Sequence, residues 1–150
     1  MSTYVKQTDL TVSITENISV NGQQYGNSQN YNFSGNGKVD QRVLEMPHSE
    51  DAVFTEVVSF STTDGKGQFI ISDYTYFRIT NLDNTNFITL KLSRASDGQC
   101  YFVKIKPSES YILMCPEIAA AVEEGASPAL GNIGKISAKP DTASVYVEYL

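Results

Sequence analysis

The sequence predicts an all-β fold, an antiparallel β-sandwich that is jelly-roll-like, with one short helix. Two observations support this fold class. Apolar and polar residues alternate with period two along most of the chain, which is the pattern of strands that bury one face. Turn signals built from Gly, Asn and Asp recur about every 8–12 residues, which is typical of sandwiches and barrels. The 150 residues suit a single β-sandwich domain over 1–150, with residues 1–9 as an extended N-terminal arm.

Strand and turn patterns follow one another along the chain. Residues 10–14 (LTVSI) alternate as a strand, and Asn21-Gly22 is the strongest short signal for a hairpin. A second hairpin is expected around the Gly-Asn-Gly turn at 35–37. Residues 54–71 predict a strand, a turn at Asp64-Gly65 and another strand. The last strand is expected over 144–150 (SVYVEYL).

Residues 74–106 predict a three-stranded meander. The loop between its first two strands would pair Ile79 with Ile88, and a two-residue Asp-Gly turn after the second strand would pair Leu92 with Val103. Both pairings place the same apolar residues on one inner face, and this agreement favours the arrangement. The inner face would hold Phe77, Ile79, Ile88, Leu90, Leu92, Tyr101, Val103 and Ile105.

The outer face of this meander would gather basic and aromatic residues on a chain whose net charge is −6. In the expected register, Lys91 lies opposite Lys104. Two interpretations remain open: a solvated face whose lysines discourage edge pairing, or a face that docks a partner. The last strand is apolar on both sides, so it is expected to be either sandwiched by the fold or covered by a neighbouring subunit. The partner-interface candidates are Tyr74, Tyr76, Arg78, Phe87, Lys91, Lys104, Tyr146 and Leu150.

One segment departs from the β pattern. Residues 117–124 (EIAAAVEE) are good helix formers, Pro116 suits a first helical turn, and Gly125 suits a C-terminal cap. A helix of about two turns is therefore expected there.

The two cysteines leave two possibilities open. A four-residue loop after Ile105 would place Cys100 opposite Cys115 and permit a disulfide, whereas a five-residue loop would not. In a cytoplasm both thiols are expected to be reduced.

Charge and hydropathy exclude several classes of partner. The chain is acidic and has no block rich in Lys and Arg, which argues against nucleic acid. No apolar run approaches the roughly 20 residues that span a membrane. Residues 1–10 lack the apolar core of a signal peptide. We therefore expect neither a nucleic-acid nor a membrane partner, and folding in a cytoplasm.

The sequence predicts no catalytic, metal-binding or cofactor-binding residues. His48 is the only histidine, and no Gly-x-Ser-x-Gly motif surrounds a serine, so a surface histidine is expected. Asp83, Asn84 and Asn86 could offer oxygen ligands to calcium, but an Asx-type turn is the better interpretation of this segment.

A glycan site is the main alternative. Aromatic rings can stack on sugars and amides can hydrogen-bond to them, although the absence of Trp weakens this interpretation. The glycan candidates are Tyr25, Asn27, Gln29, Asn30 and Tyr31.

Four stretches together resemble a known family. They are 32–47 (NFSGNGKVDQRVLEMP), 74–92 (YTYFRITNLDNTNFITLKL), 101–113 (YFVKIKPSESYIL) and 135–150 (KISAKPDTASVYVEYL). In this order they resemble small β-sandwich structural proteins from the virions of tailed bacteriophages. Those proteins have a Gln-Arg strand, a Tyr-x-Arg-Ile-x-Asn-x-Asp hairpin, a proline-containing turn and a final strand near Asp-Thr-Ala. The resemblance covers 32–150.

This resemblance implies a structural role without enzymatic activity. It implies a capsid decoration (cement) protein, or a tail or neck component, that resides in the virion after assembly in the bacterial host cytoplasm. The implied partners are the major capsid protein or other virion proteins, together with further copies of the chain in a trimer or ring. The alternative prediction is a glycan- or receptor-binding β-sandwich module on the particle.

Overall fold

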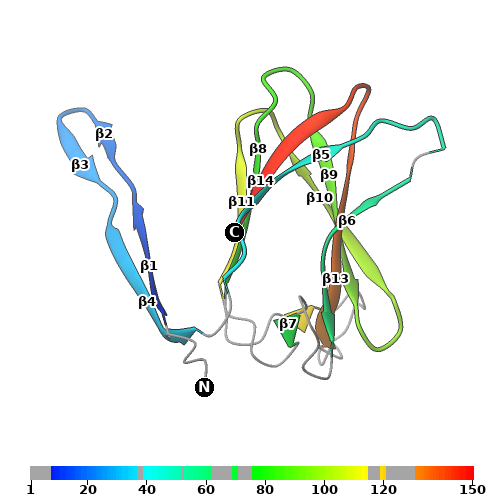
Figure 1. Ribbon diagram of the computed structural model, residues 1–150. Helices are drawn as coiled ribbons and strands as arrows, with labels where there is room; N and C mark the ends of the chain where they lie inside the picture. The colour runs from blue at the N-terminus through cyan, green and yellow to red at the C-terminus, as the bar shows by residue number, and fades with distance from the viewer. Residues whose placement is uncertain are drawn as a thin grey trace, which may run out of the picture. The chain divides into compact units, whose positions relative to one another are not determined.

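The computed structural model describes residues 8–36, 39–51, 53–61, 69–70, 76–114, 119–120 and 131–150. The chain divides into two compact units, Met1–Val39 and Asp40–Leu150, and each is described by itself (Figure 1). The prediction of one domain over 1–150, with an arm at 1–9, stays a prediction.

The first unit contains an antiparallel ladder with a second hairpin between its two strands. β1 (Thr8–Thr15) pairs with β4 (Ser28–Asn36), and β2 (Ile18–Val20) pairs with β3 (Gln23–Tyr25). Asn21-Gly22 forms the turn between β2 and β3, with positive φ angles of 51° and 79° as a type I′ turn requires. The predicted first strand and the predicted hairpin at Asn21-Gly22 are confirmed.

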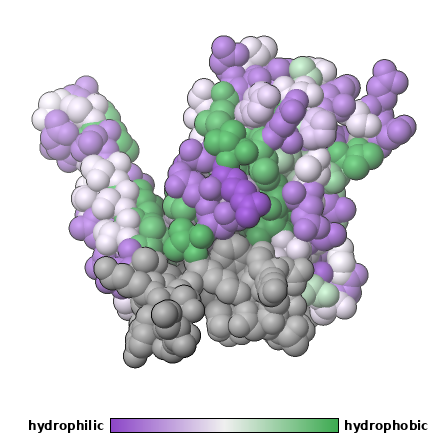
Figure 2. Space-filling view, in the orientation of Figure 1, coloured by the Kyte–Doolittle hydropathy of each residue, from purple (hydrophilic) through white to green (hydrophobic). Residues whose placement is uncertain are grey.

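The β1–β4 ladder has one polar and one apolar side. On the polar side, hydroxyl groups of β1 hydrogen-bond to side chains of β4: Thr11 to Asn32 at 3.1 Å, Ser13 to Asn30 at 2.8 Å, and Thr15 with Ser28 at 3.2 Å. Figure 2 shows hydrophobic residues gathered along the other side, which carries Leu10, Val12, Ile14, Tyr31 and Phe33. No side chain described in this ladder is fully buried.

The second unit contains eight strands of five residues or more among its described residues. They are β5 (Arg42–Met46), β6 (Thr55–Ser61), β8 (Tyr76–Asn81), β9 (Ile88–Arg94), β10 (Cys100–Ile105), β11 (Ser110–Met114), β13 (Gly131–Pro140) and β14 (Val145–Tyr149). Two further strands have two residues each, β7 (Phe69–Ile70) and β12 (Ala119–Ala120).

These strands form two packed sheets. One sheet has the order β11-β8-β14-β5, and the other has the order β10-β9-β13-β6-β7, with β12 beside β13. The eight long strands pair first with last along the chain: β5 with β14, β6 with β13, β8 with β11, and β9 with β10. Successive pairs alternate between the sheets, which is the arrangement of a jelly roll. The predicted all-β sandwich is confirmed.

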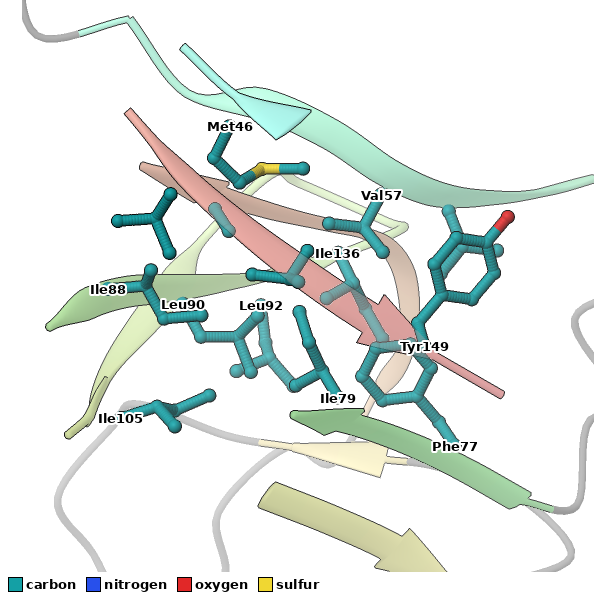
Figure 3. Close-up of a cluster of buried hydrophobic side chains, with 14 of the residues drawn as sticks. Met46, Val57, Phe77, Ile79, Ile88, Leu90, Leu92, Ile105, Ile136 and Tyr149 are labelled. Atoms are coloured by element: carbon teal, nitrogen blue, oxygen red, sulfur yellow. The ribbon is translucent and has the colours of Figure 1, made fainter. Parts of the chain in front are cut away.

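The core lies between the two sheets. Figure 3 shows Met46, Ile79 and Tyr149 from one sheet and Leu90 and Ile136 from the other, all within one cluster of side chains. Alternate residues of β8, β9 and β14 are buried, because a strand turns every second side chain to the same face. Burying one such side chain, rather than leaving it in water, contributes about 1.5–3 kcal/mol to the stability of the fold.

The prediction of a three-stranded meander is wrong for its first two strands, which do not pair. It is right that β9 and β10 pair antiparallel, and right about which side of each strand is buried. β8 and β9 lie in different sheets, so Ile79 does not pair with Ile88. The predicted inner residues Phe77, Ile79, Ile88, Leu90, Leu92 and Ile105 are buried, and Tyr101 and Val103 are partly buried against the core. Residue parity decides which face a side chain occupies, but it does not decide which strand lies alongside.

The buried side chain of Asn81 fixes the loop that connects β8 to β9 across the two sheets. The Asn81 amide donates to the carbonyl oxygens of Asn86 at 2.9 Å and of Ile105 at 3.3 Å, and its side-chain oxygen accepts from the backbone N–H of Asp83 at 3.0 Å. Ile105 belongs to β10 of the opposite sheet, so these bonds hold the crossing loop against both layers. A tight hairpin would leave this buried amide without these partners.

Two further register predictions are corrected. The loop from β9 to β10 spans 95–99 and is longer than a two-residue turn, so Leu92 pairs with Tyr101 and Lys91 pairs with Phe102. Lys104 pairs with Thr89, so the two lysines are not directly opposite. The hairpin expected around 35–37 is also absent, because β4 pairs with β1 and β5 pairs with β14.

The expected helix over 117–124 is not found. Ala119–Ala120 form β12, with Ala119 paired to Asn132 of β13, because two turns of helix are marginal alone and the first residues of β13 offer backbone partners. The rest of that segment, Cys115 and the turn at Asp64-Gly65 lie outside the described residues. Within the described part of the chain, no helix is long and apolar enough to cross a membrane.

Candidate interaction faces

The partner-interface candidates separate onto two opposite faces of the sandwich. Tyr76 and Arg78 lie on β8, and Tyr146 lies on β14, in the β11-β8-β14-β5 sheet. Lys91 lies on β9 and Lys104 on β10, in the other sheet. Of the remaining candidates, Leu150 exchanges backbone hydrogen bonds with Arg78, Phe87 directly precedes β9, and Tyr74 lies outside the described residues. The single patch expected from the sequence is therefore two surfaces.

One surface is the lysine–phenylalanine face, the outer side of β10, β9, β13 and the start of β6. Its rows follow the strand register: Lys104, Thr89 and Lys139 form one row, and Phe102, Lys91 and Ser137 form the next. The face comprises Phe54, Phe87, Phe102, Lys91, Lys104, Lys135 and Lys139.

Lysine ammonium groups lie over the phenylalanine rings of this face. Lys91 and Lys139 place their Nζ atoms 5.4 Å and 5.6 Å from the Phe54 ring centroid, and Lys104 lies 4.0 Å from that of Phe87. The ring centroids of Phe54 and Phe102 lie 5.8 Å apart, and their ring planes are tilted by 44°. These cation–π contacts hold the lysine heads near apolar surface, although Phe102 stays 55% exposed.

The charge of the lysine–phenylalanine face is opposite to that of the chain. Its described residues include four lysines, and the neighbouring Glu56 lies 3.6 Å from Lys135, which leaves a local charge of +3. The chain as a whole carries −6, so the remainder carries −9. An anionic or acidic partner is the chemistry that this face fits.

The second surface is the acidic–apolar face, formed by Val43, Glu45, Leu82, Tyr146 and Glu148 on the outer side of β14 and β5. Tyr146 pairs with Glu45, and its carbonyl accepts from the backbone N–H of Leu82 at 3.0 Å. Three apolar side chains remain about half exposed: Leu82 at 49%, Tyr146 at 56% and Val43 at 58%.

Arg78 borders the acidic–apolar face but is engaged within the sheet. Its guanidinium donates to Glu148 at 2.6 Å and to the hydroxyl of Thr80 at 2.8 Å. The Thr80 hydroxyl is 2.7 Å from that of Ser110. This network neutralises Glu148, so that among the described residues of the face Glu45 carries the charge without a paired cation.

Sequence reasoning missed Phe54, Lys135 and Lys139. The alternation in 135–139 (KISAK), where Ile136 and Ala138 are buried, would have placed both lysines on an outer face. Nothing local to the sequence reveals that this strand inserts between β6 and β9. Phe54 precedes a strand that begins at Thr55, so its position over the sheet depends on the tertiary fold.

The glycan candidates do not converge on one surface. Tyr31 and Gln29 pair with Val12 and Ile14 on the apolar side of the ladder, whereas Asn30 bonds to Ser13 on the polar side. Tyr25 is 53% exposed, and its hydroxyl donates to the side chain of Gln23 at 2.7 Å. Asn27 accepts from the backbone N–H of Ser28 in the bend between β3 and β4.

The polar loops are organised by their own hydrogen bonds. The Asp83 carboxylate accepts from the backbone N–H groups of Asn86 at 2.5 Å and Thr85 at 2.7 Å, which lowers the pKa of Asp83 and confirms the Asx-type turn. His48 is exposed, as expected, and its backbone N–H donates to Ser144. The described residues contain no group of three His, Cys, Asp or Glu side chains that could hold a metal. Cys100 is a free thiol.

Comparison of the chain with protein-family models, with curated proteins and with solved structures finds no match.

Proposed function

We propose that this protein is a non-enzymatic structural virion protein of a tailed bacteriophage, which decorates the capsid and stabilises it through protein–protein contacts. Its partners are the major capsid protein or other virion proteins, and further copies of itself. The resemblance over 32–150 supports this role, and the jelly-roll sandwich suits it because each of its two sheets presents an outer face that can contact a neighbour.

The observation that carries the proposal is the pair of surfaces on opposite sides of the sandwich. Single exposed apolar side chains are ordinary, but both faces cluster them beside charged groups, as interfaces do. Phe102 on one side and Tyr146 on the other are each more than half exposed. A protein with a contact surface on each side can join two neighbours, which is what a cement protein needs.

The direct test is particle association. Host cells producing the phage would be lysed, and the particles purified through a density gradient and quantified by mass spectrometry against the major capsid protein. We expect a fixed copy number per particle and a lower temperature of genome release when the protein is missing. Absence from particles, or a variable trace amount, would overturn the proposal.

A glycan array probed with the purified protein tests the alternative. Tyr25 and Tyr31 are 53% and 40% exposed, so a ligand could reach them. Saturable glycan binding that Tyr25→Ala abolishes would favour a receptor-binding module. We expect no such binding, because the five candidate side chains do not share a face.

A further inference from the structure

We propose that copies of this protein associate head to tail, with the lysine–phenylalanine face of one copy on the acidic–apolar face of the next. This inference deepens the proposed function by naming one partner, a second copy, and the residues that meet it. It concerns the purified chain alone, so it can fail while particle association succeeds.

The opposite charges of the two faces support a second copy of the chain as the partner. The lysine–phenylalanine face carries a local charge of +3, whereas the acidic–apolar face offers Glu148, bonded to Arg78, and Glu45, which has no ion pair with any of the residues that the structure describes. Two copies of the lysine–phenylalanine face would repel each other. The opposite face of the same chain provides the carboxylate of Glu45, to which the lysines of a second copy can pair.

The apolar residues are matched as well. Phe102 is 55% exposed beside Phe54 on one face, and Tyr146, at 56%, adjoins Leu82 on the other. Aromatic residues at the centre with charges around them are the composition of an interface core and its rim. Phe102 and Tyr146 are therefore the expected anchors.

The dimensions of the faces determine the expected affinity between two copies. Four strands spaced about 4.8 Å apart, each about five residues long at 3.4 Å per residue, give a face of about 19 Å by about 17 Å. Such a face has a projected area of about 320 Å² per copy, and the acidic–apolar face, which spans two strands, is smaller still. Both areas lie below the roughly 800 Å² per partner of stable interfaces, so we expect a weak contact with a dissociation constant no tighter than the micromolar range. Since lysines contribute, the affinity should fall as salt rises.

In a head-to-tail dimer, only one lysine–phenylalanine face and one acidic–apolar face are in contact. Each added copy leaves one face of each kind open, so association continues into a ring or a chain. This behaviour distinguishes the head-to-tail contact from a two-fold dimer, in which one face meets itself.

The test uses two variants of the full chain and sedimentation velocity. One variant, Lys91→Ala with Phe102→Ala, disables the lysine–phenylalanine face. The other, Glu45→Ala with Tyr146→Ala, disables the acidic–apolar face. Phe102 and Tyr146 are more than half exposed, so both variants should fold, and circular dichroism with thermal melting checks this.

The wild type should form species larger than dimers as its concentration rises, and about 1 M salt should reverse this. Each variant alone should associate at least about tenfold more weakly. An equimolar mixture should form dimers and nothing larger, because each variant keeps one intact face of a different kind.

Three results would overturn the inference. The wild type could stay monomeric, both variants could assemble like the wild type, or the mixture could contain only monomers. Loss of assembly in one variant with full assembly in the other would indicate a two-fold contact and would also overturn it. A monomeric wild type that binds polyglutamate would assign the lysine–phenylalanine face to an acidic foreign partner instead.

Discussion

Strands of both units alternate apolar and polar residues, but only the sandwich buries its apolar side chains. Leu10 in β1 and Leu90 in β9 occupy equivalent positions in their patterns. Leu90 is 0% exposed beneath a second sheet, whereas Leu10 stays partly exposed in a ladder of two strands. Two-stranded ladders are marginal alone, so burial requires the second layer and not only the alternation.

The two units are also stabilised by different interactions. In the sandwich, the fully buried Asn81 satisfies its side chain with backbone groups of the crossing loop and of β10 in the opposite sheet. In the ladder, hydroxyl and amide side chains bond across strands on an exposed face, and such pairs each contribute about 0.2–1 kcal/mol. A substitution in the sandwich should therefore lower the free energy of unfolding much more than a substitution in the ladder.

The largest difference is expected from matched leucine substitutions. Leu90→Ala should lower the free energy of unfolding by about 2–5 kcal/mol, because it leaves a cavity between two packed sheets. Leu10→Ala should lower the stability of the sandwich by less than about 1 kcal/mol. Urea titrations of the two variants measure both values, and similar losses would contradict the division into two units.

A smaller loss is expected at the buried asparagine. Asn81→Ala should cost about 1–3 kcal/mol, because the backbone N–H of Asp83 and the carbonyl of Ile105 each lose a hydrogen-bond partner. The control is Val53→Ala at a position 59% exposed, which should change stability by no more than about 0.5 kcal/mol. Equal thermal midpoints for the two variants would show that the Asn81 network contributes nothing.

A local effect is expected at Gly26 in the bend between β3 and β4. Its φ angle is +119°, and a Cβ added there would lie 2.0 Å from the carbonyl oxygen of Glu16. Gly26→Ala should therefore disturb the ladder while the sandwich keeps its melting temperature. Amide NMR spectra resolve the two units, and Gly22→Ala, at a positive φ with open space around it, is the milder control. Shifts throughout the sandwich would contradict this expectation.

The smallest effect is expected at Asp97, in the loop between β9 and β10. Hydrogen bonds from Arg94 lower the pKa of Asp97 from 3.8 to about 2. A lowered folded-state pKa contributes stability above the unfolded value, and this contribution is lost as the pH falls toward about 2. Asp97→Asn should thus be less stable than wild type at neutral pH, with the difference shrinking between pH 3.8 and about 2. Thermal melts of both proteins at several pH values measure this difference in stability. A difference that does not change with pH would contradict the lowered pKa of Asp97.

Several structural features follow from local sequence. The turn at Asn21-Gly22 was predictable because few residue pairs accept two consecutive positive φ angles. The buried faces of β8, β9 and β14 were predictable because side chains alternate with period two in any strand. The same rule places Lys91 and Lys104 on an outer side, although their exact neighbours required the true register.

The candidate faces were only half predictable for the same reason. Tyr76 and Lys91 were both assigned correctly to outer sides, but the expected meander merged two surfaces that the fold separates. Phe54, Lys135 and Lys139 join Lys91 only because β13 inserts between β6 and β9.

The sequence by itself determined the all-β class, the positions of most strands and the buried sides of β8, β9 and β14. These properties depend on the stereochemistry of neighbouring residues, which is local. Only the tertiary structure decided which strands pair, that β8 and β9 lie in opposite layers, and which lysines share a face. Those choices depend on contacts between distant segments, and closing a longer loop costs little extra entropy, so local patterns cannot select among the alternatives.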